Sequence, residues 1–318
     1  MMTLQKPIQT PFNAASTAAQ VMEGIDLRGK LAIVTGGHSG LGLVTVKSLA
    51  DAGARVIVPA RDPARARSAL GAIERVEVLE MDLMQPTSVK AFSQRVVSNG
   101  QPVSLLINCA GIMASPLARD ADGHESQFAT NHLGHYRLTC GLWPAIAADS
   151  GARVISVSSR GHQISGMDFD DIDFLHRPYD KWAAYGQSKT ANALFAMALD
   201  KRGVRAFSLH PGQILTELSR HLSSTEIAAF DVLDEHGRQR LDPENGLKSL
   251  EQGAATGLWC ATSAALDGLG GVYCEDCNIA TLNDSQTGRQ GVARWAADPE
   301  LAERLWALSE QWTGMTVY

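Results

Sequence analysis

One stretch of the sequence pairs a tyrosine with a lysine four residues later. Tyr185 and Lys189 belong to the segment Tyr-Gly-Gln-Ser-Lys, and helical periodicity would place both side chains on one face. A phenol with a pKa of about 10 is a poor acid or base near neutrality. A nearby ammonium favours the phenolate and lowers that pKa, so the pair could exchange a proton with a reacting oxygen. Alone, such a pair is common and usually lies on a surface, so the interpretation needs other residues.

Two serines and a histidine lie upstream of this pair. Ser159 closes an apolar run at 152–159, where its hydroxyl could hydrogen-bond a carbonyl oxygen, and its neighbour Ser158 is the alternative. His162 could donate a proton, although a hydrogen-bonded loop histidine is the commoner role. These residues outline a candidate site for acid–base chemistry on a carbonyl or a hydroxyl group.

The segments that would position these residues alternate between strand-like and helix-like patterns. Strands are expected at 31–35, 54–60, 76–82, 103–111, 152–159, 204–212 and 270–274. Helices are expected at 40–51, 63–71, 86–98, 124–148, 182–202, 246–262 and 299–312. Continuous Val, Ile and Leu runs indicate strands that are buried on both faces. The order predicts an α/β fold with one doubly wound, seven-stranded parallel sheet and helices on both of its faces.

A glycine-rich turn follows the first expected strand and leads into a helix. It reads Thr-Gly-Gly-His-Ser-Gly-Leu-Gly over 35–42. Glycines there let the backbone approach a pyrophosphate, which the N–H groups and dipole of the helix N-terminus would bind. The rival G-x-S-x-G turn of hydrolases fails because Leu41 stands where its last glycine belongs. The candidate cofactor contacts in this turn are Gly36, His38, Ser39, Gly40, Leu41 and Gly42.

The end of the second expected strand should meet the adenosine ribose of a bound dinucleotide. Ala60 and Arg61 stand there, and a guanidinium pairs with a 2′-phosphate, whereas a carboxylate would repel it. The sequence therefore favours NADP(H), with NAD(H) possible. Two alternatives stay open: Arg61 is a solvated residue at a helix start capped by Asp62, or Asp62 itself binds the ribose of NAD(H).

Taken together, these motifs resemble those of the short-chain dehydrogenase/reductase family, nearest its branch of retinol dehydrogenases and WW-domain oxidoreductases. The likeness spans about residues 12–312. It includes the segment 131–135, the long gap between Ser159 and Tyr185, His210-Pro211-Gly212 with Thr216, and the segment 252–277. The resemblance implies a single Rossmann-like domain and hydride transfer between a nicotinamide and a carbonyl or secondary alcohol.

The resemblance also assigns roles to individual residues. Tyr185 would donate the proton, Ser159 rather than Ser158 would orient the reacting oxygen, and Lys189 would hold the nicotinamide ribose and lower the tyrosine pKa. Asn131 would hold a water that relays protons to Lys189; its alternative is a plain amide on a helix surface. Further implied cofactor contacts are Asp82, Leu83, Asn108, Ala110, Gly111, Pro211, Gly212 and Thr216, with Cys109 departing from the family's usual asparagine. A non-catalytic dinucleotide sensor or scaffold is the alternative function, but such proteins tend to lose the tyrosine or lysine.

Segments outside this core would shape the substrate site. An N-terminal arm at 1–29 and a C-terminal tail at 281–318 flank the catalytic region at 30–280. Polar insertions at 160–181 and 213–245 border the expected cleft, and either could form a lid. Candidate pocket residues are Met113, His162, Ile214 and Leu218. They fit, loosely, an apolar ketone, aldehyde or secondary alcohol of medium to large size.

The helices expected at 132–148 and 182–202 are apolar on more than one stripe. One stripe should pack on the sheet, and the excess indicates burial against something else. A two-fold four-helix interface, usual in the family, would give a homodimer. The alternative is that the chain's own arm or tail covers these helices.

Composition excludes several classes of protein. The 318 residues carry a formal net charge of −6, which argues against a nucleic-acid or anionic-membrane partner. We expect no membrane span, since no apolar run approaches about 18 residues, and no secretory signal, so the prediction is a cytoplasmic protein. Five scattered cysteines do not form a disulfide framework. The pair Cys274 and Cys277 lacks further ligands, so we interpret it as two ordinary thiols and expect no metal site.

Overall fold

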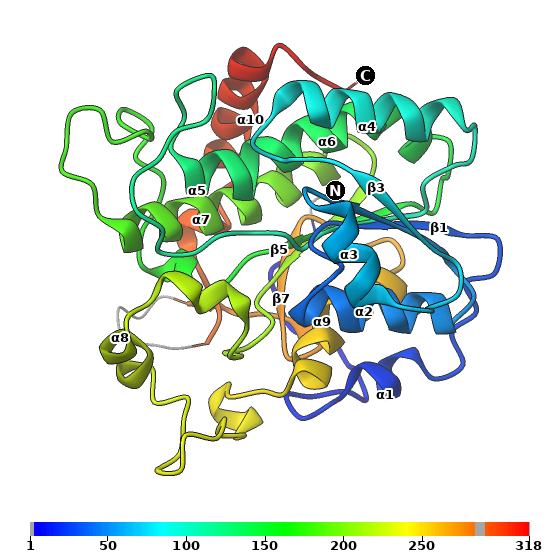
Figure 1. Cartoon of the computed structure of the whole chain (residues 1–318), viewed down its shortest axis with the longest axis horizontal. Coiled ribbons are helices and arrows are strands. Elements are labelled where there is room, and N and C mark those ends of the chain that lie inside the picture. The colour runs from blue at the N-terminus through cyan, green and yellow to red at the C-terminus, as the bar shows by residue number, and fades with distance from the viewer. Residues whose placement is uncertain (1–2, 284–289, 318) are drawn as a thin grey trace.

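In the computed structural model, residues 3–283 and 290–317 are described, and they form a central sheet between two layers of helices (Figure 1). Within those residues the sheet has eight strands in the order β3-β2-β1-β4-β5-β6-β7-β8. Their bounds are β1 (Leu31–Val34), β2 (Arg55–Ala60), β3 (Val76–Glu80), β4 (Leu105–Asn108), β5 (Arg153–Val157), β6 (Arg205–Leu209), β7 (Val272–Glu275) and β8 (Asn278–Ile279). The first seven strands pair in parallel, as the sequence predicts. The short β8 adds an antiparallel edge that the sequence analysis did not foresee.

The strand order reverses beside β1. The chain runs outward from β1 through β2 to β3, and then returns to place β4 on the other side of β1. Strands β1 and β4 are buried along their whole length, which explains their uninterrupted apolar sequences. In an open parallel sheet, ligands bind at such a reversal, beyond the carboxyl ends of the strands.

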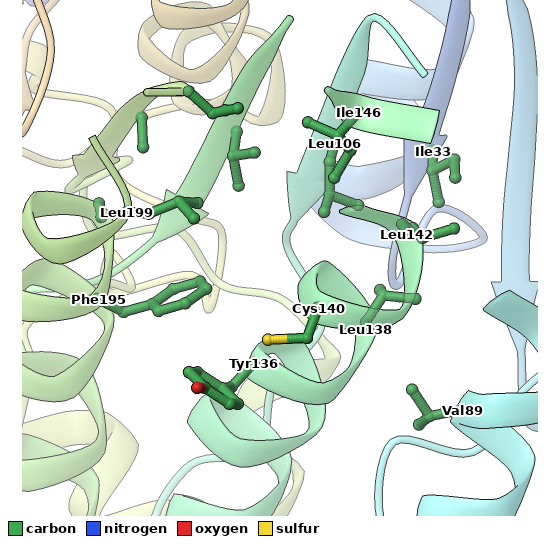
Figure 2. Packing of buried hydrophobic residues seen from close by; sticks show 14 of the residues in the cluster. Ile33, Val89, Leu106, Tyr136, Leu138, Cys140, Leu142, Ile146, Phe195 and Leu199 are labelled. Carbon is green, nitrogen blue, oxygen red and sulfur yellow. The ribbon is translucent and has the colours of Figure 1, made fainter. Parts of the chain in front are cut away.

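Helices cover both faces of the sheet (Figure 1). One face is covered by α4 (Pro86–Ser98), α6 (Gly134–Ile146), α7 (Lys181–Asp200) and α10 (Pro299–Thr313), and the other by α1 (Ala18–Met22), α2 (Gly40–Asp51), α3 (Pro63–Leu70) and α9 (Leu250–Thr262). Figure 2 shows the first core, where Ile33 and Leu106 of the sheet face Leu142 of α6. None of the helices in the described part of the chain has the length and apolar character needed to cross a bilayer.

The helix expected at 124–148 is not one continuous α-helix. The structure divides it into α5 (Ser126–Phe128), a π-helical turn at Ala129–Leu133, and α6. The ring of His135 takes part in this turn, since its Nδ1 lies 3.0 Å from the carbonyl oxygen of Asn131. Single π-helical turns inside helices often mark functional sites, and this one contains Asn131.

Helix α10 covers the apolar excess of α6 and α7. Trp306 of α10 stacks on Phe195 of α7, with ring centroids 6.0 Å apart, and it also contacts Tyr136 of α6 at 5.0 Å. The Arg202 guanidinium lies 3.8 Å from the Trp306 ring centroid. The chain's own tail thus takes the place that the predicted four-helix interface assigned to a second copy. The homodimer remains a prediction. The apolar surfaces of α6 and α7 no longer support it, because α10 packs on them.

The N-terminal arm is tied to the edge of the sheet. The Gln5 side chain donates to the carbonyl oxygens of Tyr273 (2.7 Å) and Ala280 (2.6 Å) and accepts from Tyr273 N (2.9 Å). Ile8 and Asn278 exchange two hydrogen bonds, and α1 packs on α9. The arm therefore extends the fold at β7 and β8.

The two insertions have different structures. Ile172 and Phe174 of the first insertion are buried, and Gln187 of α7 binds its backbone by donating to Ile172 O at 2.8 Å. The second insertion contains a 3₁₀ turn at Glu217–His221, α8 (Ser224–Ala229) and another 3₁₀ turn at Pro243–Asn245. A small two-stranded sheet of β9 (Leu282–Asn283) and β10 (Val292–Ala293) follows the main sheet.

Replacing Trp306 with alanine tests the role of α10. The substitution removes the stacked ring and leaves a cavity against α6 and α7, so we expect the free energy of unfolding to fall by about 3–5 kcal/mol. Chemical denaturation measures it, with Glu310→Ala on the exposed side of α10 as the control. Equal stabilities for the two variants would show that α10 does not hold this face.

Candidate active site

A cleft of about 1430 Å³ opens at the carboxyl edge of the sheet. The glycine-rich turn lines one part of it, and Ser159, Tyr185 and Lys189 line another. The predicted cofactor contacts on the cleft wall are Gly36, His38, Ser39, Gly40, Leu41, Gly42, Arg61, Asp82, Leu83, Ala110, Gly111, Tyr185, Lys189, Pro211, Gly212 and Thr216. The fold therefore brings one predicted set of residues, scattered over most of the chain, into a single cavity.

The glycine-rich turn leaves room only for backbone. A Cβ at Gly42 would collide with the carbonyl group of Gly36, and a Cβ at Gly37 would lie 2.7 Å from Val46 Cγ2. Helix α2 starts at Gly40, and the side chain of its N-cap residue Ser39 makes no capping hydrogen bond. Because this helix end lies on the cleft wall without a side-chain cap, it suits an anionic group such as a pyrophosphate.

Two arginines lie at the far end of this wall, beyond β2. Arg61 directly follows the strand, and Asp62 is the N-cap of α3, with its carboxylate accepting from Arg65 N at 3.0 Å. Arg65 also lines the cleft, and its guanidinium lies 2.9 Å from a carboxylate oxygen of Glu217. The sequence analysis missed Arg65, because Glu217 is remote in sequence and no local pattern signals the pairing.

A threonine side chain fixes the turn that follows β4. Thr35 Oγ1 accepts from Cys109 N (2.9 Å) and from Ala110 N (3.0 Å), which fixes the turn beside the glycine-rich loop. Cys109, Ala110 and Gly111 line the cleft. Asn108 does not: its side chain is buried and has no hydrogen-bond partner among the described residues. The structure thus does not place the Asn108 side chain on the cleft wall, and its contact with the cofactor stays a prediction.

Asn131 lies behind the cleft wall. Its side-chain amide donates to Ile112 O (3.0 Å) and to Ser188 Oγ (2.9 Å), and its Oδ1 accepts from Ile112 N (2.9 Å). These bonds join the turn after β4 to α7, and the side chain is fully buried. Asn131 is therefore a positioning residue in this structure, and the water relay to Lys189 stays a prediction.

The candidate reacting groups lie just after β5 and on α7. Lys189 Nζ donates to Val157 O at 2.9 Å and lies 5.7 Å from the centre of the Tyr185 ring. Ser159 Oγ accepts from Gly161 N at 3.0 Å. The Ser158 hydroxyl instead donates to the backbone carbonyl of Lys189 at 2.7 Å, which gives it a structural task. This difference favours Ser159 over Ser158 as the residue that binds a reacting oxygen.

Burial dominates the electrostatics of Tyr185 and Lys189. It raises the pKa of Tyr185 to about 12, although the hydrogen bond with Ser159 lowers that value in part. Burial also lowers the pKa of Lys189 to about 8, opposed by the attraction to Cys109. Burial and the Ser159 hydrogen bond thus set the pKa of Tyr185 in this structure, and the lysine is not among the causes of its shift.

A further part of the cleft wall is apolar and is formed largely by the second insertion; we call it the apolar end of the cleft. Met113, Ile214 and Leu218 line it, as predicted. The sequence analysis missed another group of lining residues, Trp182, Ile227 and Phe230. The rings of Trp182 and Phe230 lie 5.6 Å apart, and Lys181 pairs with Glu226 of α8 at 2.6 Å, so the start of α7 and α8 meet there.

His162 is not part of this wall. Its side chain is completely buried, and both ring nitrogens are hydrogen-bonded to protein backbone. The structure therefore shows His162 as a hydrogen-bonded loop histidine, the commoner of the two roles considered, and does not place it on the cleft wall. The first insertion contributes only its initial residues to the cleft, namely Arg160, Gly161, Gln163 and Ile164.

The cysteines make no candidate metal or redox centre. All five are free thiols, and burial raises the pKa of Cys277 to about 12. Over residues 3–283 and 290–317, no group of three or more His, Cys, Asp or Glu side chains could hold a metal ion. The C-x-x-C pair thus fits the interpretation as two ordinary thiols.

Comparisons with known proteins agree with this geometry. A family model described as short chain dehydrogenase matches residues 30–227. The chain is 42% identical over 293 residues to a "Probable oxidoreductase" of Streptomyces antibioticus, covering 89% of this chain and 97% of that protein. It is 34% identical over 303 residues to retinol dehydrogenase 12 of Mus musculus, covering 92% and 88%. The crystal structure of an uncharacterized protein from Mycobacterium Paratuberculosis matches with a TM-score of 0.72 at 33% identity, covering 96% of this chain and 99% of the other.

The chain therefore belongs to the short-chain dehydrogenase/reductase family, near its retinol dehydrogenase branch. Its predicted Rossmann-like α/β fold is confirmed. The family is one of oxidoreductases that act on small molecules.

Replacing Lys189 with methionine tests the burial of the ammonium. The pKa of about 8 lies below the ordinary value of 10.5, so the unfolded chain holds the proton more tightly and burial costs about 3 kcal/mol at pH 7. Val157 O keeps a donor in Asn192 Nδ2 at 3.1 Å. We expect Lys189→Met to raise the free energy of unfolding by about 1–3 kcal/mol at pH 7, with the gain shrinking between pH 8 and 10.5.

Urea denaturation across this pH range measures the effect. Lys90→Met, on the exposed side of α4, is the control and should show no such pH dependence. A Lys189→Met protein that is less stable than the wild type at pH 7 would contradict the burial of the ammonium as a cost. A gain in the free energy of unfolding that does not change with pH would contradict it as well.

Proposed function

We propose that the chain is an NADP(H)-dependent oxidoreductase that transfers a hydride between the nicotinamide and a carbonyl or secondary alcohol. One observation carries the proposal. A single cleft joins a glycine-rich turn suited to a pyrophosphate with Ser159, Tyr185 and Lys189. The tight backbone turn that Gly36, Gly37 and Gly42 permit and the uncapped end of α2 fit a dinucleotide. When bound, the nicotinamide would supply or accept the hydride at its C4.

The residues of the chain supply the proton and the orientation. Tyr185 would donate its hydroxyl proton to the developing alkoxide, and Ser159 would hydrogen-bond the same oxygen. A Lys189 pKa of about 8 leaves the ammonium largely protonated at pH 7. That charge would hold the nicotinamide ribose and oppose the effect of burial on the Tyr185 pKa.

The preference for NADP(H) is supported by the charges beyond β2. Arg61 is exposed on the cleft wall, and Arg65 stands beside it as a second guanidinium. Asp62, the residue that could have bound the ribose of NAD(H), uses its carboxylate to cap α3. Asp62 is thus the cap of α3, as the first alternative had it, while Arg61 stays available to a 2′-phosphate.

The apolar end of the cleft supports an apolar substrate of medium to large size. Its walls present Met113, Trp182, Leu218, Ile227 and Phe230.

A non-catalytic dinucleotide sensor is the alternative function. NADPH absorbance with hexanal, decanal, cyclohexanone and acetophenone separates the two, because a sensor would bind NADPH and oxidise none of it. A cytoplasmic location and a homodimer remain predictions.

Tyr185→Phe removes the proposed proton donor and nothing else. We expect turnover to fall by at least about a hundredfold, in line with the loss of general acid catalysis. NADPH affinity should stay within about threefold, since the ring remains. Steady-state kinetics and fluorescence titration measure the two quantities, with Tyr136→Phe on α6 as the control. Retained turnover in Tyr185→Phe would refute the assignment.

Arg61→Ala tests the cofactor preference. Losing a charge-assisted contact to the 2′-phosphate should weaken NADPH binding about 10- to 100-fold and leave NADH binding nearly unchanged. Arg65→Ala should show the same preference to a smaller extent, because Glu217 already neutralises this guanidinium. Titration calorimetry with both cofactors measures the ratio, with Arg95→Ala on α4 as the control. Equal losses for the two cofactors would count against NADP(H).

A further inference from the structure

A buried histidine stands between the reacting serine and the C-terminal part of the chain. His162 Nδ1 lies 2.6 Å from the backbone oxygen of Ser159, and His162 Nε2 lies 3.0 Å from the backbone N of Ala293. The N–H of Ala293 can only donate, so Nε2 must be the acceptor. Nδ1 then carries the hydrogen and donates it to Ser159 O. The two backbone contacts thus define one neutral tautomer of His162.

The Ser159 carbonyl is held twice by this one residue. Besides the ring, the backbone N of His162 donates to Ser159 O at 3.1 Å. Ser159 is also the N-cap of the 3₁₀ turn Arg160–Gln163, and its Oγ accepts from Gly161 N. A Cβ at Gly161 would lie 2.6 Å from Cε1 of Tyr185, so the turn packs directly on the phenol ring. Any shift of the Ser159 backbone would therefore change the distance between the two reacting hydroxyls.

Contacts with several other residues fix the backbone and the ring of His162. Its backbone oxygen accepts from Thr190 Oγ1 of α7 (3.2 Å) and from Trp295 Nε1 (3.0 Å). The Tyr273 ring lies 4.8 Å away, with its hydroxyl 3.2 Å from Nδ1. Burial lowers the pKa of His162 to about 4, which keeps the ring neutral near pH 7.

The segment 291–295 is also anchored by residues other than His162. Gly291 N donates to a carboxylate oxygen of Glu275 at 2.7 Å, and Gly291 O accepts from Gln163 Nε2 at 2.9 Å. This segment lies beyond the residues that the family model matches. It therefore gives the serine turn a support from the C-terminal part of the chain.

We propose that His162 is a positioning residue for Ser159, and that the segment 291–295 orients the serine through the fixed tautomer of this ring. The inference rests on the proposed function, because Ser159 must bind the reacting oxygen for its position to matter. Neither His162 nor Ala293 lines the cleft, so both act on the reaction only through Ser159.

Two substitutions of His162 separate its two hydrogen bonds. The amide nitrogen of asparagine can stand near the place of Nδ1 and donate to Ser159 O, but its side chain is too short to reach Ala293. The carbonyl oxygen of glutamine can reach the place of Nε2 and accept from Ala293 N, but it leaves Ser159 O without the ring donor. Each variant thus loses one buried bond and keeps the other.

We expect kcat of His162→Asn to stay within about fivefold of the wild type, and kcat of His162→Gln to fall 10- to 100-fold. Both variants should keep their Kd for NADPH and show similar losses in denaturation midpoint. The probe is the carbonyl of the panel that the wild type reduces fastest. His176→Asn and His176→Gln, at an exposed histidine, are the matched controls. The proposal would be overturned if kcat fell equally in the two variants, in step with their similar loss of stability. It would also be overturned if kcat were lower in His162→Asn than in His162→Gln.

Ala293→Pro tests the same inference without changing the histidine. The φ of Ala293 is −64°, which proline adopts, so the substitution deletes the N–H donated to Nε2 with little strain. We expect kcat to fall three- to tenfold with unchanged NADPH affinity, because the tautomer is no longer fixed. An unchanged kcat would overturn the role of the segment 291–295.

Measuring Tyr185→Phe in the same assay distinguishes a failure of the positioning inference from a failure of the proposed function. If Tyr185→Phe is inactive and His162→Gln matches the wild type, only the positioning inference fails. If Tyr185→Phe is active, the assignment of Tyr185 as proton donor fails. If the wild type reduces no carbonyl of the panel, the proposed function fails, and with it the inference that rests on it.

Discussion

Helix α7 holds Tyr185 and Lys189 where water is nearly excluded, since every residue from 184 to 199 is buried. Loss of solvent penalises the charged form of each group, so it raises the pKa of the phenol and lowers that of the ammonium. The helix therefore cannot supply a reactive tyrosine by spacing alone. The helix depends on polar neighbours that replace some of the hydrogen bonds lost with water. These are the Ser159 hydroxyl for Tyr185 and the Val157 carbonyl for Lys189.

The segments outside the alternating strands and helices create much of this environment. Helix α10 covers one side of α7, the first insertion packs beside its start, and the segment 291–295 supports the Ser159 turn. The second insertion instead walls the apolar end of the cleft. These segments thus have two places in the structure: some cover α7 and the Ser159 turn, and others form part of the cleft wall.

Local patterns in the sequence were sufficient for the sheet and for most of the cleft. The glycines at 36, 40 and 42, the Tyr185–Lys189 spacing and the apolar runs act over a few residues, and the structure confirms the parallel fold they indicate. Long-range contacts were not predictable in this way. The stacking of Trp306 on Phe195 and the bond from Ala293 to His162 join residues more than a hundred positions apart. The π-helical turn at Asn131 also depends on such a context, because the ring of His135 bonds both to that turn and to Thr35.

The most direct test of the account follows the hydride itself. NADPH carrying deuterium at C4 of the nicotinamide is mixed with the protein and the carbonyl panel, and the alcohols formed are analysed by mass spectrometry. The account predicts deuterium on the carbinol carbon of the product, in the amount of NADP⁺ formed. Tight NADPH binding with no deuterated alcohol from any carbonyl would contradict it and would favour a protein that senses the dinucleotide without reacting.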